Sequence, residues 1–168
     1  KVMSAPGDLL DDPDIDLVVI ATPNDTHFPL AKAALEAGKH VVVDKPFTVT
    51  LSQARELESL AKHCGRILSV FHNRRWDSDF LTVSALINEG QLGEVCYFES
   101  HFDRFRPQVR QRWREQAGPG SGIWYDLAPH LLDQVVVLFG LPVSITVDLA
   151  QLRPGAQSTD YFHAVLAY

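Results

Sequence analysis

Apolar residues follow two alternating spacings over residues 15–71, and this pattern predicts repeated strand–helix units. Ile15–Ala21 is a short, continuous apolar run rich in β-branched residues, which is typical of a strand buried on both faces of a sheet. Residues 27–37 place apolar side chains three and four positions apart, as an amphipathic helix does. Gly38 follows as expected after a helix C-terminus, and His40–Val43 is a second short apolar run.

The same alternation continues with a second helix, for which Thr50 or Ser52 is a suitable N-cap and Gly65 a suitable end. A third strand is predicted over Arg66–Phe71. The order strand, helix, strand, helix, strand indicates parallel βαβ units with helices on the faces of the sheet. The sequence therefore predicts an α/β fold whose first part, residues 1–72, is a partial Rossmann-like parallel sheet.

The pattern changes in residues 73–168, which predict a different architecture. The expected elements are a helix around Phe80–Ile87, a long strand over Val95–Phe105, a helix over Leu127–Phe139, and strands over Ser144–Gln151 and Tyr161–Tyr168. A loop of about nine residues, with a turn at Pro154-Gly155, joins the last two strands, which favours antiparallel pairing. This part is expected to be an α+β domain with an open, mainly antiparallel and incomplete sheet.

Composition narrows the class of protein. The chain has 168 residues, 46% hydrophobic and 21% charged, which is ordinary globular usage. A net charge of −6 disfavours a protein built to coat nucleic acid, and no apolar run is long enough to span a membrane. The two cysteines, Cys64 and Cys96, suit neither a disulfide framework nor a zinc site and indicate a reducing compartment such as the cytoplasm. No metal site is predicted.

Two polar motifs directly follow predicted parallel strands. Thr22-Pro23-Asn24-Asp25-Thr26-His27 comes after the first strand and Asp44-Lys45-Pro46 after the second. Ligands of open α/β sheets bind at the carboxyl ends of the strands, so both loops are candidates for a binding site. Lys45 could hold a substrate oxygen or relay a proton. The alternatives are a helix-capping loop, with Asp25 or Thr26 as N-cap, and a solvated lysine at a strand end.

Asp126 and His130 are four residues apart, so they share one face of the last predicted helix. Pro129 is best tolerated in a first helical turn, which predicts that the helix begins near Asp126. A histidine with a carboxylate one turn away is a credible general base, because the carboxylate fixes its tautomer. The alternative is a capping aspartate and a histidine that only packs.

Five arginines lie between residues 104 and 114, at positions 104, 106, 110, 112 and 114, together with Phe105 and Trp113. The acidic total makes nucleic-acid binding the weakest interpretation. A solvated loop, a subunit contact and a clamp for an anionic substrate all remain open. The chain contains no Gly-x-Gly-x-x-Gly, since Gly118, Gly120 and Gly122 do not follow a strand and open a helix in that spacing.

Taken in order, TPNDTH at residues 22–27, DKP at 44–46 and GIWYDLAPHLLD at 122–133 resemble the Gfo/Idh/MocA oxidoreductases. The segment His72–Phe80 is similar to the branch of NADP-dependent scyllo-inositol dehydrogenases. The resemblance implies a Rossmann domain, a C-terminal α/β domain, and hydride transfer between NAD or NADP, with NADP preferred, and a sugar or polyol. The alternative is an inactive relative or fragment that acts as a sugar-binding or assembly module.

The resemblance also implies roles for individual residues. The catalytic set is Lys45, Asp126 and His130. The residues expected to contact the cofactor are Thr22, Pro23, Asn24, His27, Asp44, Lys45 and Pro46. The residues expected to contact the substrate are Lys45, His72, Arg75, Trp76, Asp126 and His130. The implied partners are a small sugar or polyol and a second copy of the chain, bound through the open sheet, with no nucleic acid or membrane.

The family's glycine fingerprint is expected before Lys1, and the remainder of its open sheet after Tyr168. We therefore expect the 168-residue chain alone to be inactive and to bind dinucleotide weakly, because it lacks the helix N-terminus that would hold the pyrophosphate. Binding of NADPH to this chain at micromolar concentration would contradict that expectation.

Overall fold

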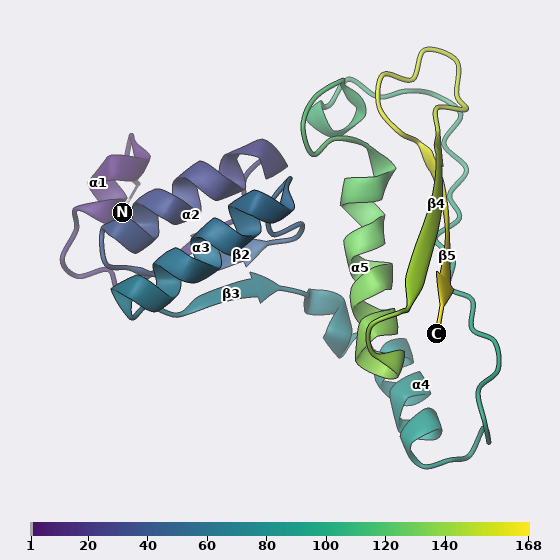
Figure 1. The fold of residues 1–168 in the computed structure, drawn as a ribbon. Helices are drawn as coiled ribbons and strands as arrows, with labels where there is room; N and C mark the ends of the chain where they lie inside the picture. The colour runs from purple at the N-terminus through teal and green to yellow at the C-terminus, as the bar shows by residue number, and fades with distance from the viewer. Residues whose placement is uncertain (1) are drawn as a thin grey trace. The chain divides into compact units, whose positions relative to one another are not determined.

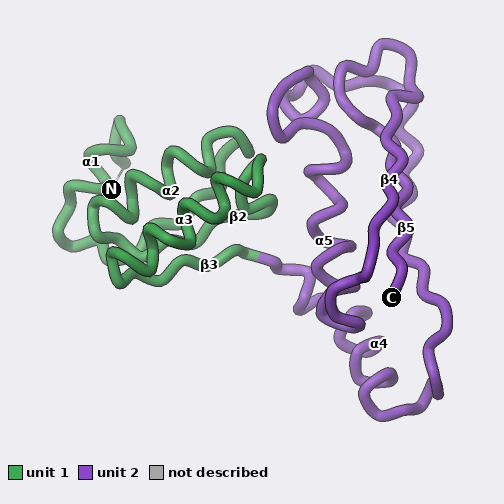
Figure 2. The backbone as a smooth tube through the Cα atoms, in the orientation of Figure 1, with its two compact units in different colours: residues 1–71 green, residues 72–168 purple. Residues whose placement is uncertain are grey.

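The computed structural model describes residues 2–168, and the chain divides into two compact units, residues 1–71 and 72–168 (Figure 2). Each unit has its own sheet. Among the described residues, no helix is both long and apolar enough to cross a bilayer.

The first unit is a three-stranded parallel sheet with its connecting helices (Figure 1). Its elements are α1 (Pro6–Leu10), β1 (Leu17–Ile20), the 3₁₀ turn η1 (Asn24–Thr26), α2 (His27–Glu36), β2 (His40–Asp44), α3 (Leu51–Cys64) and β3 (Leu68–Phe71). The strand order is β1-β2-β3, and both neighbouring pairs are parallel. The predicted βαβαβ order is confirmed, whereas α1 was not predicted.

The ends of α3 follow from local chemistry. Thr50 is the N-cap, and its side-chain oxygen accepts a hydrogen bond from the Gln53 backbone N–H at 3.3 Å. Gly65 ends the helix in the left-handed conformation, with φ of 61°. Of the two N-caps left open by the sequence, Thr50 is the one used.

Helices α2 and α3 cover the same face of the sheet, because right-handed crossovers between strands in consecutive order place both helices on one side (Figure 1). The core lies between them and the strands, and comprises Ile20, Ala31, Ala34, Leu35, Val41, Val43, Leu57 and Ala61. On the opposite face Val19 is 64% exposed and Phe71 55% exposed. The prediction that the first strand is buried on both faces is therefore wrong for this chain, since no described helix covers the second face.

The second unit combines helices with a two-stranded antiparallel sheet (Figure 1). Its elements are η2 (Asn73–Trp76), α4 (Ser78–Asn88), η3 (Trp113–Glu115), α5 (Gly122–Phe139), β4 (Ser144–Ala150) and β5 (Tyr161–Ala167). The register pairs Ser144 with Ala167 and Ala150 with Tyr161, which confirms the predicted antiparallel pair. Helix α5 packs on β5, where the Trp124 and Phe162 rings meet edge to face at 5.4 Å.

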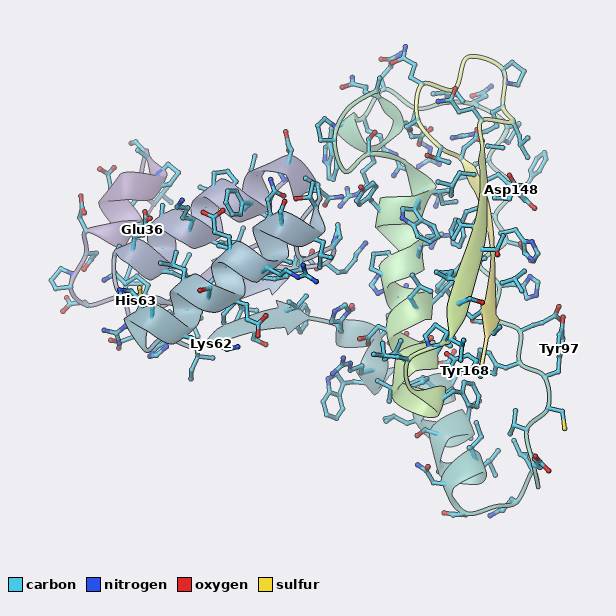
Figure 3. The ribbon with its side chains drawn as sticks, in the orientation of Figure 1. Glu36, Lys62, His63, Tyr97, Asp148 and Tyr168 are labelled. Atoms are coloured by element: carbon cyan, nitrogen blue, oxygen red, sulfur yellow. The ribbon has the colours of Figure 1, made fainter. Side chains whose placement is uncertain are left out.

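The strand expected over Val95–Phe105 is absent from the described structure (Figure 1). The segment is extended but has no ladder of hydrogen bonds, and its side chains are largely exposed, as Figure 3 shows for Tyr97. Apolar alternation specifies an extended backbone, whereas a strand also needs a neighbouring strand to pair with.

The start of α5 differs from the sequence prediction as well. The helix begins at Gly122 rather than near Asp126, so Pro129 lies inside it instead of in its first turn. Gly122 has φ of 88°, and the next residue, Ile123, donates its backbone N–H to the Thr159 carbonyl at 2.7 Å. This bond to the β5 side of the unit anchors the helix start, and the sequence pattern around Pro129 does not contain that information.

Candidate functional site

In the first unit, the two polar motifs lie at the same edge of the sheet. β1 and β2 are parallel, with Ile20 paired to Val43, so the loops that follow them leave the sheet at their common carboxyl end. Thr22 and Pro23 are exposed there, while Asn24 is buried. This arrangement brings the two predicted cofactor loops together.

His27 ties these loops to each other. Its side chain is 1% exposed, with Nδ1 2.8 Å from the Pro46 carbonyl oxygen and Nε2 3.0 Å from the Thr22 carbonyl oxygen. Carbonyl oxygens only accept hydrogen bonds, so a neutral ring donates to one of them and a protonated ring to both. His27 thus positions the two loops, and its predicted contact with cofactor stays a prediction.

The loop after β2 has a defined backbone. The Lys45 N–H donates to Asp44 Oδ1 at 2.7 Å, and the Lys45–Pro46 peptide bond is cis. Pro46 is buried, whereas Asp44 and Lys45 are half-buried. The carboxylate of Asp44 therefore stabilises the backbone from which the Lys45 side chain extends.

In the second unit, Asp126 and His130 lie one turn apart on α5, as the spacing predicts. His130 is 6% exposed and Asp126 is half-buried. Arg114 from η3 brings its Nε to 3.6 Å from Asp126 Oδ1, so the carboxylate faces a guanidinium. The sequence singled out both residues but not this pairing.

The predicted substrate residues His72, Arg75 and Trp76 lie at or beside η2. Arg75 donates two hydrogen bonds to Asp133 of α5, at 2.7 and 2.6 Å, and these bonds raise the pKa of its guanidinium. Burial lowers the pKa of His72 below its usual range, although the charge of Asp133 opposes this effect. Trp76 is 75% exposed. Arg75 is thus held by α5, and its contact with substrate stays a prediction.

The second unit also contains a cavity of about 360 Å³. Its charged lining residues are Arg104, Arg106, Arg112, Arg114, Arg153, Glu115, Asp126 and Asp160. Four of these arginines belong to the run noted in the sequence. Arg153, which lies between β4 and β5, was missed, and no local pattern marks it. Arg153 is recognised only in the folded structure, by its ion pairs with Glu115 and Asp160.

Glu115, Arg153 and Asp160 form an ion-pair network beside this cavity. Arg153 Nη2 lies 3.1 Å from Glu115 Oε2, and its Nε donates to Asp160 Oδ2 at 2.8 Å. Glu115 also accepts hydrogen bonds from Arg112 Nε at 2.7 Å and from the Arg110 N–H at 3.0 Å. The two carboxylate side chains are only 7% and 6% exposed. The network therefore fixes the β4–β5 connection to η3.

Gly122, at the start of α5, should tolerate no side chain. A Cβ at this position would lie 2.9 Å from the Thr159 carbonyl oxygen, and φ of 88° is unfavourable for other residues. We expect Gly122→Ala to reduce the free energy of unfolding of this unit by about 2–3 kcal/mol. Urea unfolding followed by tryptophan fluorescence measures this, because Trp76, Trp113 and Trp124 all lie in residues 72–168.

Gly118→Ala is the matched control for this substitution. No atom lies within 4 Å of a Cβ built on Gly118, and its φ is not in the left-handed region. We expect an effect within about 0.5 kcal/mol there. Equal effects of the two substitutions would contradict the packing argument for Gly122.

These features match one class of protein. Residues 1–72 match the family model described as oxidoreductase family, NAD-binding Rossmann fold, and residues 84–168 match the model described as oxidoreductase family, C-terminal alpha/beta domain. The chain belongs to the Gfo/Idh/MocA oxidoreductase family.

Individual relatives agree with this assignment. The chain is 83% identical to the uncharacterized oxidoreductase YdgJ of Escherichia coli, over 99% of this chain and 48% of that protein. It is 43% identical to the scyllo-inositol 2-dehydrogenase (NADP⁺) IolW of Bacillus subtilis, over 96% of this chain and 45% of that protein. The chain thus spans about half the length of the curated relatives that it matches.

Solved structures show the same fold. The YPO2259 oxidoreductase of Yersinia pestis superposes with a TM-score of 0.90 at 70% identity, over 98% of this chain and 46% of that one. The yvaA oxidoreductase of Bacillus subtilis superposes with a TM-score of 0.96 at 42% identity, over 100% of this chain and 48% of that one. The family's NAD-binding domain indicates a nicotinamide cofactor.

Proposed function

We propose that this chain is part of an NAD(P)-dependent oxidoreductase that transfers a hydride between the nicotinamide and a hydroxyl-bearing carbon of a sugar or an inositol-like polyol. The observation that supports it best is the loop with Lys45 at the carboxyl edge of the family's NAD-binding sheet. The Asp126–His130 pair on α5 adds a candidate proton acceptor. IolW, a relative that acts on scyllo-inositol with NADP⁺, supports the polyol class and the preference for NADP.

The chemistry of the first unit fits one half of the cofactor. The carboxyl edge of the sheet carries the Thr22 hydroxyl and the Lys45 ammonium, which suit ribose hydroxyls and the nicotinamide amide. The buried His27 keeps the two loops together. We assign the nicotinamide and ribose contacts to residues 22–24 and 44–46. When bound, the nicotinamide would accept or donate the hydride at the substrate carbon.

Side chains of this chain would accept the proton of the substrate hydroxyl and stabilise the charge that develops on its oxygen. In the direction of oxidation, His130 takes the proton of the substrate hydroxyl as general base. Lys45 donates a hydrogen bond to the same oxygen and stabilises the charge that develops on it. Asp126 holds a neighbouring hydroxyl or orients His130. These roles follow the family resemblance and are proposals for this protein.

Assays of the whole protein with NADP⁺ and NAD⁺ test this function against a panel of inositols and sugars. We expect reduction of the cofactor with at least one polyol, and faster reduction of NADP⁺. Lys45→Met should lower kcat by about 10²–10³-fold, because it removes a hydrogen-bond donor to the reacting oxygen.

Lys62→Met is the matched control, since Lys62 is exposed on α3 (Figure 3), where it pairs with Glu58. It should leave turnover unchanged. Binding of a polyol without cofactor reduction would instead favour the non-catalytic sugar-binding module.

A further inference from the structure

The cavity of the second unit has an excess of positive charge. Five arginines line it, at positions 104, 106, 112, 114 and 153, against the three carboxylates of Glu115, Asp126 and Asp160. Its volume of about 360 Å³ is typical of small-molecule sites, which occupy about 300–1,000 Å³. All of its lining residues belong to residues 72–168, so the cavity is formed by the second unit.

The three carboxylates are already matched to particular arginines. Glu115 and Asp160 accept hydrogen bonds from Arg112 and Arg153, as described above. Asp126 faces Arg114, which also stacks over the Trp113 ring with its guanidinium carbon 4.3 Å from the ring centre. The carboxylates of the lining therefore pair with three of its five arginines, namely Arg112, Arg114 and Arg153.

Arg104 and Arg106 are the remaining two. Neither makes an ion pair with a carboxylate among residues 2–168, and the Arg104 guanidinium lies 5.8 Å from the centre of the Phe102 ring. Arg106 is half-buried, and its pKa is lowered by desolvation and by the nearby charges of other arginines of the run, although the charge of Glu115 opposes this shift. Two neighbouring guanidinium groups that form no ion pair among the described residues are an arrangement that an anion stabilises.

The start of α5 adds to this field. Gly122 and Ile123, the first two residues of this 18-residue helix, line the same cavity. A helix N-terminus has a partial positive charge, which favours a nearby anion. Asp126, a proposed catalytic residue, lines the cavity as well.

We propose that this cavity binds the oxyanion group, a carboxylate or a phosphate, of a sugar-like substrate, with Arg104 and Arg106 as its principal ligands. The guanidinium fork donates parallel hydrogen bonds to either group. The proposal that the anion belongs to the substrate rests on the proposed oxidoreductase function, because Asp126, a proposed catalytic residue, also lines the cavity. The binding of an oxyanion by the cavity does not depend on turnover.

Ligand titration of the full chain tests the proposal directly. The probes are glucose 6-phosphate, glucuronate and glucose, which share a sugar ring and differ in charge, with binding followed by calorimetry. We expect at least one charged sugar to bind about tenfold or more tightly than glucose, as charge-assisted hydrogen bonds allow. The charged sugar that binds more tightly identifies phosphate or carboxylate as the recognised group.

Variants then locate the binding. Arg104→Gln combined with Arg106→Gln should weaken binding of the charged sugar about tenfold or more and leave glucose unaffected. Arg55→Gln is the control for the arginine-to-glutamine change, because it removes one positive charge from an exposed position of α3 in the first unit. Tryptophan fluorescence verifies that the variants are folded.

Equal affinity for all three sugars, or no binding of either charged sugar, would overturn the proposal without the need for a variant. An unchanged affinity in the double variant would overturn the assignment to Arg104 and Arg106. Turnover of a neutral polyol by the whole protein, with no binding of charged sugars, would leave the proposed function intact and remove this inference. Tight binding of a charged sugar without any turnover would support this inference and contradict the proposed function.

Discussion

Replacement of His130 by asparagine should lower the kcat of the whole protein by about 10²–10⁴-fold, the usual contribution of a general base. His130 is 6% exposed on α5, so asparagine fills a buried polar position of similar shape but cannot accept the substrate proton. The affinity for substrate should change much less than kcat. Steady-state kinetics with the polyol identified by the panel provide the measurement.

His63→Asn is the matched control for this prediction. His63 is exposed near the C-terminal end of α3, where the same change in chemistry touches no proposed site (Figure 3). Its kcat should equal that of the unmodified protein. In the His130 variant, the plot of kcat against pH should also lose the limb that reports protonation of the general base. A His130 variant that retains full kcat would exclude the histidine as the general base.

Replacement of Arg153 by methionine should reduce the free energy of unfolding of the second unit by about 3 kcal/mol. This is the lower end of the cost of breaking a buried ion pair, because the Arg153 side chain is 22% exposed. Methionine preserves much of the side-chain volume but leaves Glu115 and Asp160 buried without their shared guanidinium. Urea unfolding followed by tryptophan fluorescence measures the change in this unit alone.

The same network should make the stability of the second unit depend on acid pH. Burial alone would raise the pKa values of Glu115 and Asp160, but hydrogen bonds and the neighbouring arginines lower both below their usual 4.5 and 3.8. A carboxyl whose folded pKa is lowered stabilises the protein above its unfolded pKa and loses that contribution as pH falls. We therefore expect the free energy of unfolding to be constant near neutrality and to decrease below about pH 4.5.

Arg153→Met should flatten this dependence, because the arginine that lowers both pKa values is removed. Arg55→Met, at an exposed position of α3, should change stability by no more than about 0.5 kcal/mol and retain the acid dependence. If Arg153→Met is as stable as the control between neutral and acid pH, the network does not stabilise the β4–β5 connection.

Local signals account for the parts of the fold that the sequence predicted. The strands at β1, β2 and β3 are short apolar runs, and Gly38 and Gly65 end the helices between them. Each of these features depends on neighbouring residues, so a periodicity or a glycine is enough to indicate it. The loops at Thr22 and Lys45 were placed at one sheet edge for the same reason, since parallel pairing follows from the order of the elements.

Non-local pairing explains the expectations that were wrong. Val95–Phe105 alternates like a strand, yet it pairs with no other strand among the described residues. The pattern of Ile15–Ala21 predicts a strand buried on both faces, yet both packed helices lie on one face of the sheet. The helix α5 begins at Gly122 because Ile123 bonds to Thr159, a residue far along the chain.

The sequence by itself determined the two-part organisation of elements, the parallel order of the first sheet and the family. It also indicated that Lys45 follows the second strand and that Asp126 and His130 lie one turn apart on the last helix. Only the tertiary structure showed that His27 joins the Thr22 and Pro46 loops, and that Arg153 joins Glu115 to Asp160 beside a cavity lined with arginines. The physical reason is that periodicity encodes local geometry, whereas ion pairs and side-chain hydrogen bonds are made between residues brought together by folding.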